Sequence, residues 1–331
     1  MSNLALAAFA AATDSHVVEK PRTARFATFQ RSFDAPAYLE RLAQSGFRWL
    51  GRSDVEFPAP LASIHDPPPG LFLRGGATAE LLSRAAVAIV GARSCSPYGS
   101  QVARALGREL AGNGLVIVSG LARGIDGEAH RGALDAGGKT VAVLGCGIDR
   151  DYPASHAALA GSIAENGLIV SEYPPGVDPA PWRFPARNRI VAGLSAATVV
   201  VEARERSGAL ITADLALEEG REVFAVPGEI TSGLSHGTNA LLRLGATPLT
   251  CAADVLESLG LTPARAEDGG LGETAKRVLE RLRDSSASAD ELARATGLDA
   301  GEVSVALVEL ELAGLVAEGA GLYREVLRTG N

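Results

Sequence analysis

Six short apolar runs in the middle of the chain constrain its fold more than any other feature. Each run is followed by a turn marked by glycine and then by a stretch of helical character, such as Gln101–Ala111 or Ala209–Glu219. Uninterrupted apolar runs of this length are typical of parallel strands that helices cover on both faces. The pattern therefore predicts a doubly wound α/β domain with a mostly parallel sheet at residues 81–260. The expected strands are Val87–Val90, Leu115–Ser119, Thr140–Leu144, Leu168–Ser171, Thr198–Glu202 and Glu222–Val226.

Arginine residues recur where these strands end. A doubly wound sheet binds its ligands at the carboxyl ends of its strands, so side chains at these points are expected to share one edge. Acidic residues occur there as well, and some of the arginines are expected to pair with them. The frequency of arginine nevertheless predicts an anion-binding rim. Its arginines are Arg93, Arg123, Arg150, Arg187, Arg189, Arg204 and Arg206.

The segment before the fifth expected strand places an aromatic residue, two arginines and an asparagine after a proline-rich loop. Pro185 is expected to block helix continuation and to hold Phe184 extended. Arg187, Asn188 and Arg189 can then open a short helix, whose free N–H groups and guanidinium groups favour an anion. The ring of Phe184 adds a surface on which a base can stack. The alternative is a pair of loop arginines that form surface salt bridges.

Two further turns, at residues 120–127 and 206–212, join a strand end to a helix through glycine. Glycine lets the backbone approach a phosphate and aims amide N–H groups at it, and Ser207 and Gly208 lie in the second turn. The alternative for both turns is close packing of strand against helix. His130 could act as a base, although a helix histidine that packs against a neighbouring turn is the more common arrangement.

The motifs of nucleotide-dependent enzymes are absent from the sequence. The turn Gly91–Gly99 lacks the G-x-G-x-x-G fingerprint of a dinucleotide fold. Residues 137–140 lead into a strand, whereas a P-loop leaves a strand and enters a helix. No set of nucleophile, base and orienting group stands out, and no His, Asp or Glu cluster has the spacing of metal ligands. We therefore expect no catalytic residue, no metal and no cofactor.

Composition sets further limits on the class of protein. The net charge of −8 argues against a generally basic nucleic-acid binder, so a polyanion would need a local basic patch. Three widely spaced cysteines argue against a disulfide framework and fit a reducing compartment. The run Leu4–Ala12 resembles a short signal-peptide core but lacks a preceding Lys or Arg, and no apolar run reaches the length of a membrane span. The expected location is the cytoplasm.

The sequence outside the sheet domain divides into three parts. Residues 1–80 form a small N-terminal region, in which Tyr38–Leu42 has helical spacing and Gly46 is expected to end the helix. Residues 261–271 form a linker rich in proline, glycine and charge. Residues 272–331 follow the order helix, helix, turn, helix and hairpin, which is typical of a winged helix-turn-helix.

The C-terminal module is acidic where a DNA-reading module would be basic. From residue 271 onward it has seven bases and eleven acids, a net charge of −4. The helix that would read DNA carries Glu302, Glu309 and Glu311 and no base, so it offers phosphates no attraction. We therefore expect this module to contact protein. Its expected elements are the helices Glu273–Arg283, Asp290–Thr296 and Ala300–Ala313 and the hairpin strands Leu315–Ala317 and Leu322–Arg324.

The ordered motifs of residues 84–255 resemble those of the DNA-processing protein A family, also called DprA or Smf. This resemblance implies an extended Rossmann-like domain that binds single-stranded DNA and forms a homodimer. Members of the family help to load the RecA recombinase onto strands coated by single-strand-binding protein, notably in natural transformation. The matching motifs are Val87–Arg93, Ser119–Asp126 with Ala129 and His130, Val141–Gly145, Ser171–Pro174, Phe184–Ile190, Val201–Thr212 and Gly220–Gly228.

Carried over by position, the resemblance implies that Arg93 holds phosphate, together with the Arg187-Asn188-Arg189 run. It implies single-stranded DNA, RecA, single-strand-binding protein and a second copy of the chain as partners. Ala92 stands where Ser or Thr is usual, and Ala154 where relatives often place a basic residue. The N-terminal region lacks the two-helix pattern of many relatives and is expected to be a degenerate helical SAM-like domain. The expected DNA-binding residues are Gly91, Arg93, Arg123, Tyr152, Phe184, Arg187, Asn188, Arg189, Ser207 and Gly208.

Two other functions compete with a non-enzymatic recombination mediator. A nucleotide phosphoribohydrolase of the lysine-decarboxylase-like group has a related Rossmann domain, but its P-G-G-x-G-T-x-x-E motif is missing from Glu202–Thr212. A transcription factor that reads duplex DNA through the winged helix is disfavoured by the acidic third helix. The leading hypothesis is therefore binding of single-stranded DNA without catalysis.

Overall fold

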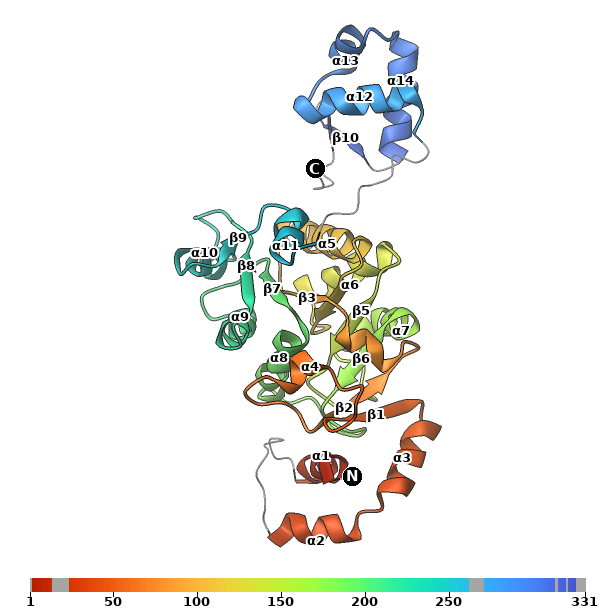
Figure 1. Ribbon diagram of the computed structural model, residues 1–331. Coiled ribbons are helices and arrows are strands. Elements are labelled where there is room, and N and C mark those ends of the chain that lie inside the picture. Colours follow the sequence, from red (N-terminus) through yellow and green to blue (C-terminus); the bar gives the residue numbers. More distant parts are fainter. Residues whose placement is uncertain (1, 14–23, 262–270, 313–314, 320, 326–331) are drawn as a thin grey trace. The chain divides into compact units, whose positions relative to one another are not determined.

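The computed structural model describes residues 2–13, 24–261, 271–312, 315–319 and 321–325. The chain forms two compact units, Met1–Leu259 and Gly260–Asn331, and each is described by itself (Figure 1). The linker expected at residues 261–271 lies almost wholly outside the described residues.

A nine-stranded sheet forms the centre of the first unit, in the order β1-β2-β6-β5-β4-β3-β7-β8-β9. The seven strands from β6 to β9 along that order are parallel, whereas β2 runs antiparallel to β6 and β1 antiparallel to β2. All six expected strands are present within two residues of their expected bounds, which confirms the doubly wound α/β fold. The strands are β1 (Phe47–Gly51), β2 (Gly70–Arg74), β3 (Ala86–Val90), β4 (Val116–Ser119), β5 (Thr140–Val143), β6 (Leu168–Ser171), β7 (Ala197–Val200), β8 (Glu222–Ala225) and β9 (Thr247–Pro248).

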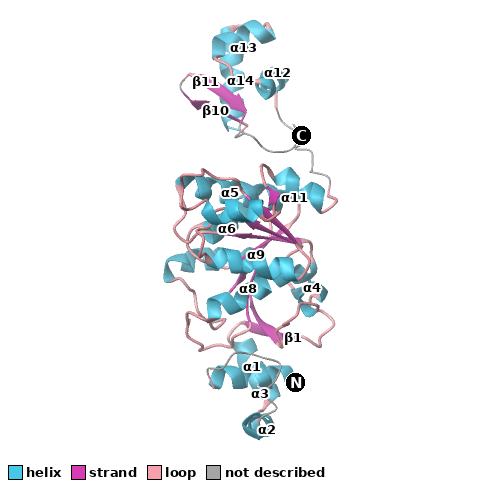
Figure 2. Cartoon of the chain, turned by 90° about the vertical axis from the view of Figure 1, so that its left-hand side faces the viewer, coloured by secondary structure: helices cyan, strands magenta, loops and turns pink. Residues whose placement is uncertain are grey.

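Helices enclose the strands of this unit on both faces (Figure 2). On one face α8 (Arg183–Leu194) and α9 (Gly208–Glu218) pack their apolar residues against the sheet. On the other face α5 (Pro97–Gly112) and α6 (Ile125–Asp135) do the same, so that the sheet is buried between two apolar layers. No helix in the described ranges is both long and apolar enough to cross a membrane. The remaining helices are α1 (Ser2–Ala12), α2 (Ala24–Ser32), α3 (Ala35–Gln44), α4 (Ala59–Ala62), α7 (Ala157–Asn166), α10 (His236–Arg243) and α11 (Ala252–Ser258), with short 3-10 helices at Ala79–Ser83 and Ala154–His156.

The N-terminal region is joined to the sheet rather than set apart from it. Strands β1 and β2, which the sequence did not predict, extend the sheet at its β6 edge, and residues 1–80 belong to the first unit. Helix α1, formed by the apolar run Leu4–Ala12, buries Leu4 against the same core. Helix α3 confirms the helix expected around Tyr38–Leu42, and Gly46 follows it at a φ of +76°.

The second unit is a small helical module with a hairpin. Its helices are α12 (Glu273–Asp284), α13 (Ala289–Thr296) and α14 (Ala300–Leu312), and its hairpin strands are β10 (Val316–Gly319) and β11 (Leu322–Glu325). Leu279, Leu292 and Leu310 are among the residues of its own apolar core. Gly297 ends α13 at a φ of +68°, in the left-handed region that glycine adopts without strain. These elements confirm the expected winged-helix order.

The expectation that Pro185 blocks a helix is wrong. Helix α8 begins at Arg183, so Phe184 and Pro185 both lie in its first turn and Phe184 is not extended. Proline is tolerated there because the first N–H groups of a helix have no partner within the helix. The position of the Phe184 ring is therefore set by the first turn of α8 and not by a preceding loop.

Gly132 lies at a close contact between α5 and α6. A Cβ atom on Gly132 would lie 2.1 Å from the carbonyl oxygen of Arg104 on α5. That neighbour is backbone, so it cannot move away without shifting the helix.

We expect Gly132→Ala to lower the free energy of unfolding by about 1–3 kcal/mol, because the added methyl group forces the two helices apart. Gly161→Ala is the matched control: nothing lies within 4 Å of its added Cβ atom in α7, so stability should rise by up to about 1 kcal/mol. Urea unfolding followed by tryptophan fluorescence measures both effects, because Trp49 and Trp182 both lie in the first unit. Identical unfolding midpoints for the two variants would contradict the packing described.

Candidate nucleic-acid interface

Two adjoining cavities lie at the carboxyl ends of the central strands. Strand β3 pairs with β4 on one side and β7 on the other, so the direction of the chain across the sheet reverses there. A doubly wound sheet has its ligand crevice at this point. The larger cavity, here called the strand-end pocket, has a volume of about 270 Å³, and the smaller side pocket about 120 Å³. Arg93, Ala122, Phe184 and Arg187 line both.

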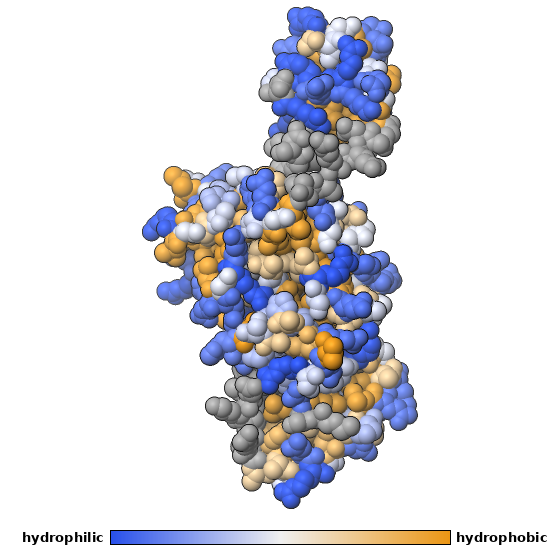
Figure 3. Space-filling view, in the orientation of Figure 1, coloured by the Kyte–Doolittle hydropathy of each residue, from blue (hydrophilic) through white to orange (hydrophobic). Residues whose placement is uncertain are grey.

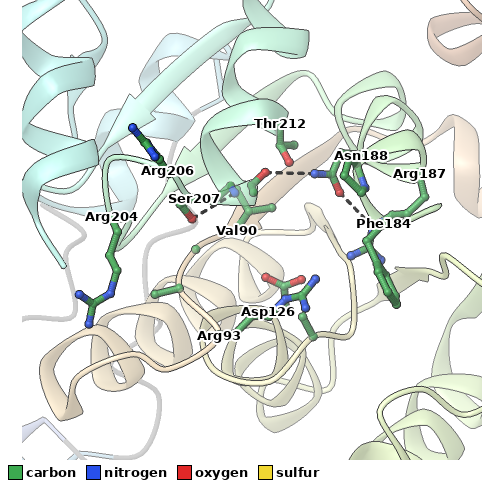
Figure 4. A pocket seen from close by; sticks show the side chains of 16 residues that line it. Val90, Arg93, Asp126, Phe184, Arg187, Asn188, Arg204, Arg206, Ser207 and Thr212 are labelled. Carbon is green, nitrogen blue, oxygen red and sulfur yellow. Dashed lines mark hydrogen bonds between the residues drawn. The ribbon is translucent and has the colours of Figure 1, made fainter. Parts of the chain in front are cut away.

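The N-terminus of α9 forms one wall of the strand-end pocket (Figure 4). Ser207 precedes the helix, and its hydroxyl accepts a hydrogen bond from the N–H of Ala209 at 3.3 Å. The N–H of Leu210 donates to the carbonyl oxygen of Ser207 at 3.1 Å. The N–H of Gly208, at the first position of the helix, has no partner within the helix, and such groups attract anions. Arg204 and Arg206 come just before the helix, line the pocket and are exposed. This wall offers both amide and guanidinium donors to a phosphate.

Arg93 supplies an accessible guanidinium group between the two cavities. It follows β3 directly and is exposed, with its Cζ atom 5.2 Å from the centre of the Phe184 ring. Among the described residues, no hydrogen bond or ion pair engages this guanidinium. It is therefore available to a phosphate oxygen at the mouth of the site.

An aromatic pair borders the side pocket. The rings of Tyr152 and Phe184 stack with their centres 5.3 Å apart and an angle of 28° between their planes. Tyr152 is 42% exposed, and Arg123 beside it in the side pocket is exposed as well. A flat apolar surface next to cations is suited to an unpaired nucleobase.

Arg187 and Asn188 connect the walls of the strand-end pocket through hydrogen bonds within the protein. Arg187 is buried and donates from Nη1 to the carbonyl oxygens of Gly120, at 2.7 Å, and Val143. Its Nε donates to Oδ1 of Asn188 at 3.0 Å, and Nδ2 of Asn188 donates to the carbonyl oxygen of Gly208 at 3.1 Å. The turn after β4 is thereby tied to the N-terminus of α9.

A buried carboxylate accompanies this buried cation. Asp126 lines the strand-end pocket and accepts a hydrogen bond from the N–H of Gly120 at 3.1 Å. Burial raises the pKa of Asp126, while Arg187, the N–H groups of Ala122 and Gly120, and Arg93 act in the opposite direction. Burial likewise lowers the pKa of Arg187, against the attraction of Asp126. For both groups burial outweighs the attraction of the opposite charge, so the pKa of Asp126 is raised and that of Arg187 is lowered.

The turn after β4 is fixed by its backbone. Leu121 adopts a φ of +57°, which side chains other than glycine rarely do, and Gly124 adopts +75°. A Cβ atom on Gly124 would lie 2.3 Å from the carbonyl oxygen of Ala92, so the turns after β3 and β4 touch each other. Backbone strain of this kind persists where the surrounding structure holds it in place, commonly at binding sites.

Arg189 does not reach either cavity. Its Nη1 and Nη2 donate to the two carboxylate oxygens of Glu172, at 2.9 and 2.7 Å, and its Nε donates to Oδ2 of Asp66 at 2.9 Å. Burial lowers the pKa of Arg189, but Glu172 and Asp66 raise it by more. The structure therefore makes Arg189 the centre of a buried ion pair, and the phosphate contact that the resemblance implied stays a prediction.

The structure brings nine of the ten expected residues to the two cavities. Seven line the strand-end pocket and two, Arg123 and Tyr152, line only the side pocket; their role in binding DNA stays a prediction. Asp126, Arg204, Arg206 and Thr212 also line the strand-end pocket but were not among the expected residues. Arg204 and Arg206 had been expected in the anion-binding rim, and Asp126 and Thr212 lie in the two glycine turns at residues 120–127 and 206–212, so the sequence marked all four positions without assigning them to DNA binding. No group of three or more His, Cys, Asp or Glu residues in the described ranges is placed to hold a metal ion. The seven expected residues that line the strand-end pocket are Gly91, Arg93, Phe184, Arg187, Asn188, Ser207 and Gly208.

We expect Arg189→Met to lower the free energy of unfolding by about 3–5 kcal/mol, because it leaves the Glu172 carboxylate buried without its cation. The double variant Arg189→Met/Glu172→Leu should recover most of this loss, since a buried pair replaced by apolar residues is often tolerated. Urea unfolding followed by tryptophan fluorescence compares the two. Equal destabilisation of the single and double variants would show that the ion pair does not account for the effect.

Comparison with family models finds two matches along the chain. Residues 48–260 match the model described as DNA recombination-mediator protein A. Residues 262–321 match the model of the DprA winged helix domain. The first match covers the sheet of the first unit from β1 to β9 and therefore includes both cavities.

Several known proteins are similar to this chain over most of its length. Protein Smf of Escherichia coli is 42% identical over 312 residues, which cover 88% of this chain and 83% of that protein. The X-ray structure of DprA from Streptococcus pneumoniae has a TM-score of 0.67 at 40% identity and covers 78% of this chain and 93% of its own. A DprA structure from Helicobacter pylori, described for its single-stranded DNA binding mode, has a TM-score of 0.58 at 35% identity and covers 64% and 95%. On this evidence the chain belongs to the DNA recombination-mediator protein A (DprA/Smf) family, and its C-terminal unit is the winged helix of that family.

Proposed function

We propose that this protein binds single-stranded DNA in the strand-end pocket and helps to load the RecA recombinase onto it during natural transformation and recombination, without catalysis. One arrangement carries the proposal: the N-terminus of α9, the exposed guanidinium of Arg93 and the Tyr152–Phe184 pair meet at two adjoining cavities. The Helicobacter pylori relative, described as binding single-stranded DNA, supports the same ligand here.

The chemistry of the two cavities suits a single strand better than a duplex. Phosphates would lie against the α9 N-terminus and the guanidinium groups of Arg93, Arg204 and Arg206. A base would lie against the aromatic pair, which requires that it be unpaired, because a duplex keeps its bases stacked inside. The net charge of −8 is compatible with this because binding depends on the local cluster of cations.

We assign different roles to the three residues of the Arg187-Asn188-Arg189 run. Arg187 and Asn188 are positioning residues, since their hydrogen bonds set the distance between the turn after β4 and the start of α9. Arg189 holds α8 to Glu172 and Asp66, is buried and lines neither cavity. Arg93 is then the arginine whose guanidinium group contacts phosphate most directly.

We also propose that two copies of the chain associate at the β9 edge of the sheet. Ile230 is 87% exposed and Leu244 85% exposed, on either side of α10. Hydrophobic residues lie among hydrophilic ones over this part of the surface (Figure 3). Exposed apolar side chains beside a sheet edge are a feature of protein interfaces. RecA and single-strand-binding protein would be further partners, and the cytoplasm the place of action.

We expect Arg93→Ala to weaken binding of a fluorescent single-stranded oligonucleotide by about tenfold to a hundredfold, because a lost hydrogen bond to a charged group costs about 1.5–3 kcal/mol. The slope of log affinity against log salt should become shallower by about one, as one phosphate contact is lost. Arg108→Ala is the matched control, since Arg108 is exposed on α5 and lines neither cavity.

Fluorescence anisotropy at several salt concentrations measures these quantities, and tryptophan fluorescence confirms that each variant is folded. Unchanged affinity of a folded Arg93→Ala variant would overturn the assignment of the site. A lowered melting temperature with normal DNA affinity would instead show that Arg93 holds the turns after β3 and β4 together.

A further inference from the structure

One helix of the second unit exposes apolar side chains that its own core does not use. Helix α14 buries Val303, Ala306 and Leu310 against α12 and α13. On its other side, Val305 is 69% exposed and Val308 54% exposed. In Figure 3 hydrophobic residues interrupt the hydrophilic surface of this unit along the side where Figure 1 shows α14.

These residues form a stripe with acidic borders. Successive residues of an α-helix are rotated by about 100°, which places Gly301, Val305 and Val308 within about 60° of one another. The same rotation places Glu302 and Glu309 along one border of the stripe and Glu311 along the other. We call this surface, made of Gly301, Val305 and Val308 with Glu302, Glu309 and Glu311, the α14 stripe.

The carboxylates of the α14 stripe are not neutralised within the unit. Glu302 accepts a hydrogen bond from the N–H of Asp299 at 3.0 Å, and Glu309 accepts one from the N–H of Gly272 at 2.8 Å. Neither these two nor Glu311 forms an ion pair with Lys or Arg in the described part of the second unit. Helix α14 itself contains no basic residue. The stripe therefore keeps its negative charge.

Valine at these positions does not serve the stability of the helix. A β-branched side chain loses rotational freedom in a helix, and an exposed one recovers little of that loss by packing. Two such residues on one face, with charges along both borders, have the pattern of a surface that receives another amphipathic segment.

We propose that the α14 stripe docks a basic amphipathic segment of a partner protein, with apolar residues against Val305 and Val308 and Lys or Arg side chains against the three glutamates. Opposite charges favour this occupant over nucleic acid, whose phosphates the glutamates would repel. A second α14 stripe is disfavoured for the same reason, because glutamates would face glutamates. The proposal concerns a different surface from the strand-end pocket and is independent of DNA binding there.

The test uses the full chain and three synthetic labelled peptides. The first is an amphipathic helix with a leucine stripe bordered by lysines, the second has the same composition in scrambled order, and the third replaces its lysines with glutamates. We expect only the first to bind well, and Val305→Ser/Val308→Ser to weaken its binding at least about tenfold. Glu311→Lys should weaken it as well, and added salt should reduce it. Val55→Ser is the matched control, because Val55 is fully exposed in the first unit.

Fluorescence anisotropy gives the affinities, and far-ultraviolet circular dichroism verifies that α14 remains folded in each variant. Equal binding of the scrambled peptide would mean that charge alone attracts it and would overturn the proposal. So would unchanged binding in the folded valine and Glu311 variants. Loss of affinity for a duplex oligonucleotide in the valine variants would reassign the stripe to DNA.

Discussion

The buried guanidinium of Arg187 is the group on which the geometry of the strand-end pocket depends. A buried cation must be hydrogen-bonded and balanced by charge, and Arg187 meets both needs through Gly120, Val143, Asn188 and the nearby Asp126. These partners come from the ends of β4 and β5 and from α6 and α8. The contacts of the Arg187 guanidinium therefore fix the positions of these elements relative to one another. Through Asn188 the same network reaches the first turn of α9. In the proposed function, the hydrogen-bond donors for phosphate come from distant parts of the chain and are already in position before DNA binds.

The distribution of charge separates two kinds of surface on an acidic protein. Exposed arginines gather at the carboxyl edge of the sheet, where Arg93, Arg204 and Arg206 line the strand-end pocket. The α14 stripe of the second unit has the opposite sign and an apolar centre. A polyanion and a basic protein segment would therefore be drawn to different units of the same chain. A mediator that holds DNA and a protein together would benefit from such a separation.

Much of the fold could be predicted from the sequence because its strands are buried on both faces. Runs such as Val87–Val90 are apolar at every position, and their order with the intervening helices determines where the ligand crevice lies. Strands β1 and β2 were missed because they form an antiparallel addition at the sheet edge and are separated by a proline-rich segment. The linker of the two units lies outside the described residues and stays a prediction.

The sequence was enough to predict where the candidate site lies, but not which contacts each of its arginines makes. Arg187 and Arg189 are two residues apart, yet one spans the floor of the pocket and the other pairs with Glu172 and Asp66. These partners are distant in the sequence, and a helix turns successive side chains in different directions. Local sequence therefore shows that arginines gather at an edge, whereas only the tertiary structure shows which of them remain available to a ligand.

Competition between single-stranded and duplex DNA tests most directly the central claim that the site binds single-stranded DNA. The protein is titrated with a labelled single-stranded oligonucleotide and then with the unlabelled single strand or its duplex as competitor, at about 0.1 M salt. The account predicts that the single strand competes at least about tenfold better, because the Tyr152–Phe184 pair can stack only an unpaired base. Equal competition by the duplex would contradict it.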